Sequence, residues 1–192
     1  MTAHVDDFVV YAANQEDTCW LLNSMSTKFD IKDLGEIKSY LGMEIHRSDG
    51  QTKLTQRQFL DNLLAGASMD NANPPKTPLA DGICIIDLPN LAIDIMLYQH
   101  YVGCLQWLAI WTRPDLARTA SFLAQYNSKP TNQVYTAIQH CLKYLSRSRD
   151  CGVTYKISSN SNSLLQVYTN SDWGGSLMIS GFYFSLAGGP IH

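Results

Sequence analysis

The stretch Ala3-His4-Val5-Asp6-Asp7-Phe8-Val9-Val10-Tyr11 places two adjacent carboxylates between short apolar runs. Valine favours extended backbone, and aspartate tolerates the unusual backbone angles of tight turns. The stretch therefore predicts a β-hairpin with Asp6 and Asp7 at its turn. A structural turn is one interpretation of this pair. A metal site is the other, because phosphoryl transfer uses oxygen ligands around two divalent ions that lie about 3.5–4 Å apart.

Charge is distributed unevenly along the 192 residues, although the formal net charge is only -3 and the hydrophobic fraction is 45%. This composition is typical of a globular protein of one medium domain or two small ones. Residues 1–36 hold seven acids against two lysines, whereas residues 113–149 hold six Lys or Arg residues against one acid. The acidic part suits cation binding, and the basic part suits either phosphate contact or a solvated helix face.

The five cysteines form no Cys-x-x-Cys pair and no zinc-site spacing. Their odd number predicts free thiols in a reducing compartment. No apolar run reaches membrane-spanning length, and Asp6 and Asp7 interrupt the first residues in a way that a signal peptide does not allow. We therefore expect an intracellular protein without a membrane partner.

Helical and strand patterns alternate in the first third of the chain. Asn14 is placed to cap a helix whose apolar stripe, over residues 18–29, is expected to pack against the hairpin. A second hairpin is predicted over residues 39–55. Thr55-Gln56-Arg57-Gln58 then has the form of a capping box, which predicts a helix with an apolar face over residues 59–67.

A proline-containing segment follows, and two long apolar stripes come after it, over residues 98–108 and 134–145. Pro114 predicts that the first of these helices ends near Arg113, and Thr131 is placed to cap the second. Residues 152–155, 164–168 and 181–186 predict strands.

Taken together and in this order, the motifs resemble those of reverse transcriptases from the Pol polyproteins of copia-type LTR retrotransposons. The family's Tyr-Val-Asp-Asp box corresponds to residues 4–7, with His4 in place of the tyrosine. The other matching motifs are Phe29-Asp30-Ile31-Lys32-Asp33-Leu34-Gly35, Tyr40-Leu41-Gly42-Met43-Glu44-Ile45, Thr112-Arg113-Pro114-Asp115, Leu142-Lys143-Tyr144-Leu145 and Tyr168-Thr169-Asn170-Ser171-Asp172-Trp173-Gly174.

The resemblance implies an α+β fold: a partial polymerase palm of β-hairpins with packed helices, a helical connection and the first strands of an RNase H-like sheet. Residues 1–67 would be the C-terminal part of the palm, and residues 68–97 a linker or thumb-like segment. Residues 98–150 would form the helical connection, and residues 151–192 a truncated RNase H-like segment.

The same resemblance implies the site residues and their ligands. Asp6 and Asp7 would be catalytic ligands of Mg²⁺, and an RNA or DNA template–primer would be the substrate. The primer-grip turn would be Leu41-Gly42-Met43, where the glycine lets backbone approach the primer. Template contact is one interpretation of the basic side chains near the end of the 134–145 helix, and complementing the helix dipole is the other; they are Lys143, Arg147 and Arg149.

A second acidic site is expected to be degenerate. Asn170 stands where the family's RNase H domain has an aspartate, and an amide lacks the negative charge that holds a hard cation. Asp172 lies two residues further along an extended strand, about 6.6 Å away, and is an uncertain substitute. The other acidic ligands would lie beyond His192, so RNase H activity is not expected.

The function implied is RNA-directed DNA polymerisation by two-metal nucleotidyl transfer in a parent protein, in the cytoplasm, nucleus or a virus-like particle. The isolated chain is expected to be inactive, because the fingers and the first palm aspartate would precede Met1. The alternatives are a non-catalytic nucleic-acid-binding remnant and a non-functional relic of a Pol polyprotein.

Overall fold

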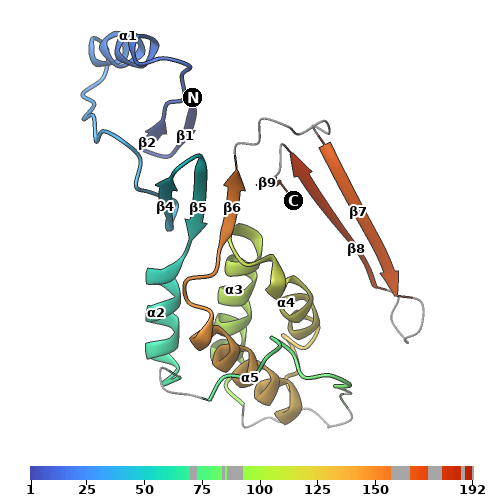
Figure 1. The fold of residues 1–192 in the computed structure, drawn as a ribbon. Helices are drawn as coiled ribbons and strands as arrows, with labels where there is room; N and C mark the ends of the chain where they lie inside the picture. Colours follow the sequence, from blue (N-terminus) through green and yellow to red (C-terminus); the bar gives the residue numbers. More distant parts are fainter. Residues whose placement is uncertain are drawn as a thin grey trace. The chain divides into compact units, whose positions relative to one another are not determined.

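The computed structural model describes residues 1–69, 73–83, 85, 93–156, 165–172, 179–186 and 189–191. Within them, α-helices are combined with antiparallel sheets, in agreement with the predicted α+β class (Figure 1). The chain divides into two compact units, Met1–Tyr40 and Leu41–His192. The finer assignment of palm, connection and RNase H-like segments stays a prediction.

The first unit consists of a short hairpin, one helix and a connector. Strands β1 (Thr2–His4) and β2 (Asp7–Val9) pair in antiparallel fashion, as the sequence predicted. Helix α1 (Gln15–Ser26) follows, and the two-residue strand β3 (Ser39–Tyr40) ends the unit. The predicted cap is confirmed, because the Asn14 side chain accepts a hydrogen bond of 2.8 Å from the Asp17 N–H.

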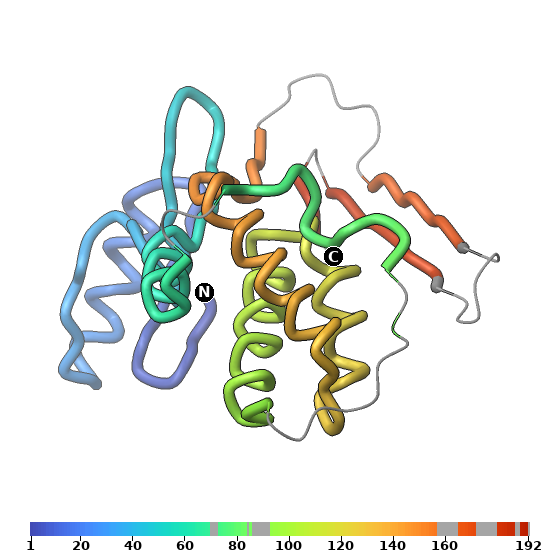
Figure 2. Tube along the Cα trace, turned by 90° about the horizontal axis from the view of Figure 1, so that it is seen from below, coloured from blue at the N-terminus to red at the C-terminus, as the bar shows by residue number. Residues whose placement is uncertain are grey.

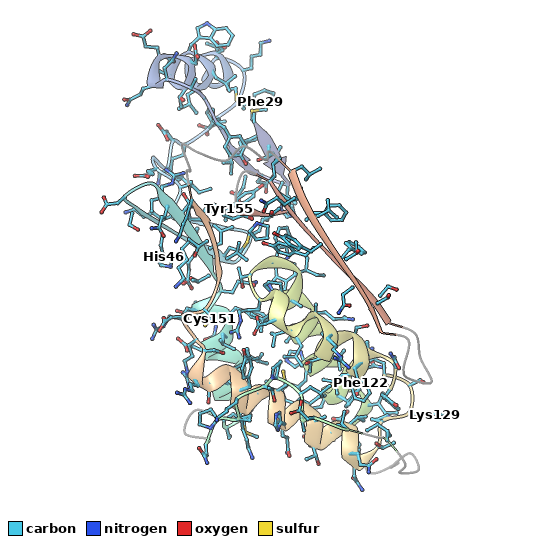
Figure 3. The ribbon with its side chains drawn as sticks, turned by 45° about the vertical axis from the view of Figure 1, so that its right-hand side comes forward. Phe29, His46, Phe122, Lys129, Cys151 and Tyr155 are labelled. Carbon is cyan, nitrogen blue, oxygen red and sulfur yellow. The ribbon has the colours of Figure 1, made fainter. Side chains whose placement is uncertain are left out.

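The expectation that α1 buries its apolar stripe against the hairpin is wrong. No side chain of α1 is fully buried: Leu21, Leu22 and Met25 of the stripe are half-buried. Phe29, labelled in Figure 3, is exposed. A segment of forty residues with one helix and a hairpin of two three-residue strands has too little apolar surface to close a core of its own.

The second unit contains a sheet whose strands are far apart in the sequence. Strands β4 (Met43–Ser48) and β5 (Gln51–Thr55) form the second predicted hairpin. Strand β6 (Val153–Lys156) pairs with β5, in a register that joins Leu54 to Val153. A strand that we expected to open the RNase H-like sheet thus extends the hairpin of the predicted palm. Glycine permits this approach, since a Cβ on Gly152 would lie 2.0 Å from the Leu54 carbonyl oxygen.

The core of this unit is helical. It is built from α2 (Arg57–Gly66), α3 (Ile95–Trp111), the 3₁₀ turn η1 (Pro114–Leu116), α4 (Ala117–Ala124) and α5 (Asn132–Arg147). Helices α3, α4 and α5 lie side by side in both views (Figures 1 and 2). The two predicted stripes are confirmed as core, and their buried members are Tyr98, Val102, Leu105, Leu108, Val134, Ala137, Ile138, Cys141, Leu142 and Leu145.

Helix boundaries in this core follow the local signals. Helix α3 ends before Pro114, at Trp111, with Thr112 as its C-cap. The Thr131 hydroxyl accepts a hydrogen bond of 3.3 Å from the Val134 N–H and so caps α5, as predicted. At the start of α3 the Asp94 carboxylate accepts hydrogen bonds from two backbone N–H groups, a cap that the sequence analysis did not identify.

A third sheet consists of β7 (Leu165–Asp172), β8 (Ile179–Leu186) and β9 (Gly189–Pro190). The Tyr155 hydroxyl, labelled in Figure 3, donates a hydrogen bond of 2.8 Å to the Pro190 carbonyl oxygen. Gly189 lies directly against the Tyr155 ring, where any larger residue would collide with it. Trp173 and Gly174 of the last predicted motif lie outside the described residues.

Across the described part of the chain, none of the helices combines the length and the apolar character that crossing a membrane requires.

Candidate active site

The aspartate pair lies at the tip of the first hairpin. His4 faces Asp7 across the two strands, so the turn residues are Val5 and Asp6 and not the predicted Asp6 and Asp7. Asp7 instead begins the returning strand. Val5 has a positive φ of 53°, which is unusual for a β-branched residue and stores strain at the turn. The hairpin thereby presents two successive carboxylates at a sharply bent tip.

The carboxylates are open to solvent. Asp6 and Asp7 are both exposed, and no donor or cation in the described chain forms a hydrogen bond or an ion pair with either one. No His, Cys, Asp or Glu trio with metal-binding geometry occurs among the described residues. The tip therefore offers two oxygen ligands of the kind that Mg²⁺ prefers, and further ligands would be needed to hold two ions.

The predicted primer-grip turn is a tight bend with left-handed backbone. Leu41 has a φ of 51° and Gly42 a φ of 74°, and a side chain on Gly42 would meet nothing within 4 Å. Met43 follows at the start of β4 and is buried. The exposed glycine leaves its backbone open to a ligand, while the buried methionine anchors the bend.

Glu44, one residue further, joins this hairpin to helix α2. One carboxylate oxygen accepts a hydrogen bond from the Gln58 N–H and the other from the Thr55 hydroxyl, each at 2.8 Å. Burial alone raises the pKa of Glu44, but these hydrogen bonds and nearby His46 outweigh it and hold the pKa below its ordinary value. The predicted capping box is therefore wrong: the cap comes from a neighbouring strand, a partner that helical periodicity cannot identify.

Gln56 and Thr112 form a second contact that the sequence did not reveal. The Thr112 hydroxyl donates a hydrogen bond of 2.7 Å to the Gln56 side-chain oxygen, and both side chains are buried. Since Gln56 is the N-cap of α2 and Thr112 the C-cap of α3, the bond fixes one helix end to the other.

Side chains of the Thr112-Arg113-Pro114-Asp115 motif form hydrogen bonds that connect the helices of the core. The Arg113 side chain is 3% exposed and binds the Asp115 carboxylate through two hydrogen bonds of 2.8 and 2.9 Å. It also donates to the backbone oxygen and the hydroxyl of Ser148, each at 2.9 Å. Tyr144 donates a hydrogen bond to the same carboxylate. The motif therefore joins the break after α3 to the carboxyl end of α5.

The three basic residues near the end of α5 that were predicted to contact a template, Lys143, Arg147 and Arg149, differ in their partners and exposure. Arg149 forms an ion pair of 2.9 Å with Asp61 of α2. Arg57 binds Asp150 in the same cluster, close to Cys151, which Figure 3 labels. Lys143 and Arg147 are exposed on α5, one helical turn apart. The structure thus gives Arg149 a role between helices and leaves the other two accessible to a nucleic acid.

The residues of the degenerate acidic site lie on β7. Asn170 pairs with Gly181 and is exposed, while Asp172 pairs with Ile179 at the end of the strand. The predicted strand is therefore confirmed. Position 170 holds an uncharged asparagine, and the degenerate acidic site stays a prediction.

Comparisons with known proteins give matches to reverse transcriptases and to transposon proteins. A family profile described as "Reverse transcriptase (RNA-dependent DNA polymerase)" matches residues 1–81. The chain is 31% identical over 182 residues to the "Retrovirus-related Pol polyprotein from transposon RE2" of Arabidopsis thaliana, covering 91% of the chain and 12% of that relative. It is 28% identical over 204 residues to the "Retrovirus-related Pol polyprotein from transposon TNT 1-94" of Nicotiana tabacum. That match covers 98% of the chain and 15% of the relative.

A third relative is the putative transposon Ty5-1 protein of Saccharomyces cerevisiae, which is 26% identical over 198 residues, with coverage of 100% of the chain and 63% of that protein. The chain thus spans only 12% to 15% of the length of the two plant Pol polyproteins. No solved structure gives a significant match.

Proposed function

The chain belongs to the family of copia-type reverse transcriptases, and from this premise we propose that its first hairpin carries two metal ligands of an RNA-directed DNA polymerase. Asp6 and Asp7 would bind Mg²⁺ during attack of a primer 3′-hydroxyl on the α-phosphate of a nucleotide. The observation that carries the proposal is a strained hairpin tip with two exposed carboxylates inside the segment that matches the family.

The chemistry explains what each part of the hairpin contributes. Carboxylate oxygens are the preferred ligands of Mg²⁺, and the metal lowers the cost of the charge that develops on the phosphoryl oxygens. The hairpin holds the backbone of Asp7 through its pairing with His4, and Asp6 lies in the adjoining turn. Two carboxylates are fewer than a two-ion site needs, so we propose that catalysis takes place in the parent polyprotein and that the chain alone is inactive.

The metal site is tested directly on the 192-residue chain. Mn²⁺, a paramagnetic substitute for Mg²⁺, is expected to broaden the backbone amide signals of residues 4–8 selectively, and excess Mg²⁺ should restore them. The variants Asp6→Asn and Asp7→Asn should abolish the effect. Asp49→Asn is the matched control, since Asp49 is an exposed aspartate at the tip of the other hairpin, also with positive φ.

Selective broadening that survives Asp6→Asn would refute the metal site. A primer-extension assay with Mg²⁺ tests the second part of the proposal, that the chain alone is inactive. No incorporation is expected from the chain alone, and incorporation that disappears in Asp6→Asn would show instead that the chain is a complete polymerase.

A second candidate function, nucleic-acid binding without catalysis, is favoured by the charge of the helical region. Arg113 and Arg149 are neutralised by Asp115 and Asp61, but four other cations in residues 113–149 are exposed. They are Arg118, Lys129, Lys143 and Arg147. If all four contact phosphates of a duplex, the logarithm of the binding constant should fall with the logarithm of salt concentration with a slope of about -3.6.

The experiment is a salt titration of binding to an RNA–DNA duplex. The double variant Lys143→Gln/Arg147→Gln should weaken binding and reduce the slope by about 2. Lys28→Gln, which removes an exposed lysine outside this region, should leave the slope unchanged. Equal slopes for the double variant and the parent would exclude α5 as the contact surface.

A further inference from the structure

The sheet of β4, β5 and β6 has two chemically different faces (Figure 1). Side chains alternate between the faces along each strand, so the register assigns every residue to one face. One face carries all the apolar side chains of the three strands, which are Met43, Ile45, Leu54, Val153 and Tyr155, together with Arg47 and Thr52. The opposite face, called here the polar face, consists of Glu44, His46, Ser48, Gln51, Lys53, Thr55, Thr154 and Lys156. His46 and Tyr155, both labelled in Figure 3, thus lie on opposite faces.

Two lysines from distant parts of the sequence come together on the polar face. Lys53, on the central strand, lies between His46 of β4 and Thr154 of β6. Lys156 pairs with Gln51, so it is the diagonal neighbour of Lys53, at about 7–8 Å between the two backbone positions. Only the pairing of β5 with β6 creates this proximity, which is why the sequence analysis did not identify it.

Neither lysine is neutralised by the protein. Within the described ranges no carboxylate forms an ion pair or a hydrogen bond with Lys53 or Lys156. Glu44 is the only acid of the polar face, and its two oxygens already accept hydrogen bonds from the Gln58 N–H and the Thr55 hydroxyl. Lys156 is exposed and Lys53 is half-buried.

The two charges do not help to hold the sheet together. Like charges on neighbouring strands repel each other, so the lysines slightly disfavour the pairing of β5 with β6. A bound anion would relieve this repulsion and would gain two unpaired ammonium groups as partners. The arrangement therefore fits a ligand with closely spaced negative charges.

We propose that the polar face binds the phosphate backbone of a nucleic acid, with Lys53 and Lys156 as its two charged contacts. The inference rests on the proposed function, in which a nucleic acid is the substrate, and it adds a surface on different elements from the cations of α5. Each ammonium group has three donors on a flexible stem, so the two lysines can contact neighbouring phosphates of one strand. The Ser48 and Thr154 hydroxyls are further donors to phosphate oxygens on the same face.

Contacts of this kind carry no information about base sequence. They position the duplex and make its binding depend on salt, because each neutralised phosphate releases counterions. We therefore expect the polar face to bind duplexes of different sequence equally well.

The test is a salt titration of the full chain with an RNA–DNA duplex. Lys53→Gln/Lys156→Gln should reduce the slope of the logarithm of the binding constant against the logarithm of salt concentration by about 2. It should also weaken binding by more than about tenfold near 0.1 M salt. Lys53→Arg/Lys156→Arg keeps both charges and should retain the slope, and Lys28→Gln in the first unit is the control for loss of a lysine elsewhere.

A gain of charge tests the same face independently. Gln51 is exposed and lies opposite Lys156, so Gln51→Lys should steepen the slope by about 1. Urea unfolding separates binding from a structural role: the midpoint of the double glutamine variant should be unchanged or higher, because a repulsion is removed. If that variant unfolds instead, Gln51→Lys still gives the answer.

Two results would overturn the inference. If the parent chain binds the duplex, but the double glutamine variant and Gln51→Lys both keep its slope, the polar face is not a contact surface, while binding through α5 stands. If the parent chain does not bind the duplex at all, this inference and the proposed binding of nucleic acid fail together.

Discussion

Arg113 carries a positive charge almost completely removed from water. Its guanidinium is compensated by Asp115 and by two hydrogen bonds to Ser148, and the Tyr144 ring lies 5.7 Å away. The attraction of a buried ion pair mainly offsets the cost of taking its charges out of water, whereas removing one partner leaves an uncompensated buried charge and destabilises the fold strongly. The stability of the fold therefore depends on Asp115 more than it would on one partner of a surface ion pair.

We predict that Asp115→Asn lowers the free energy of unfolding by about 2–3 kcal/mol. This lies below the range for fully buried pairs, because Asp115 itself is 38% exposed and solvent screens part of the attraction. Urea unfolding measures the change. The exposed pair partner Asp150→Asn is the comparison, and it should cost less than about 1 kcal/mol.

The same pair predicts a pH dependence. Burial raises the pKa of Asp115, but the hydrogen bonds and the charge of Arg113 outweigh burial and hold that pKa below its ordinary value. A lowered folded-state pKa gives stability that is present above about pH 4 and is lost as the pH falls through the folded-state value. Asp115→Asn should lack this acid-dependent component, and an unchanged pH profile would contradict the assignment.

At the scale of elements, helix α2 begins with a cap supplied by another strand. We predict that Glu44→Ala destabilises the protein by about 1–2 kcal/mol, because the Gln58 N–H and the Thr55 hydroxyl both lose their acceptor. Thermal unfolding of Glu44→Ala, Thr55→Val and the double variant tests the coupling. Strictly additive losses would show that the two residues do not interact.

Strand β6 depends on the absence of a side chain at one position. We predict that Gly152→Ala destabilises the protein by more than about 1 kcal/mol, because the new methyl group would overlap the Leu54 carbonyl group. Gly103→Ala is the matched control: it lies inside α3 with open space around it, and alanine favours helix by about 0.5–1 kcal/mol. Chemical denaturation of both variants should therefore give changes of opposite sign.

For the whole molecule, the two units differ in how much they bury. The second unit contains a continuous core over α2, α3, α4 and α5, while no side chain of α1 in the first unit is fully buried. We predict that amides of α3 and α5 exchange with deuterium orders of magnitude more slowly than those of α1, since local opening of α1 breaks few contacts. Hydrogen exchange followed by mass spectrometry checks this, and equal protection of α1 and α5 would contradict it.

The sequence by itself determined the first hairpin, the two apolar stripes, the break before Pro114 and the cap at Thr131. These features depend on neighbours a few residues away, through turn preferences, helical periodicity and the missing proline N–H. Likewise, the aspartate pair could be identified because adjacent residues need no fold to bring them together.

Only the tertiary structure decided which distant groups meet. It placed Glu44 at the start of α2, Gln56 against Thr112, and β6 beside β5 at Gly152. It also left the stripe of α1 only half-buried, although that stripe has the same periodicity as the buried ones. The physical reason is that a periodic pattern marks the face that can be buried, whereas burial itself requires a second surface, and its position depends on the path of the whole chain.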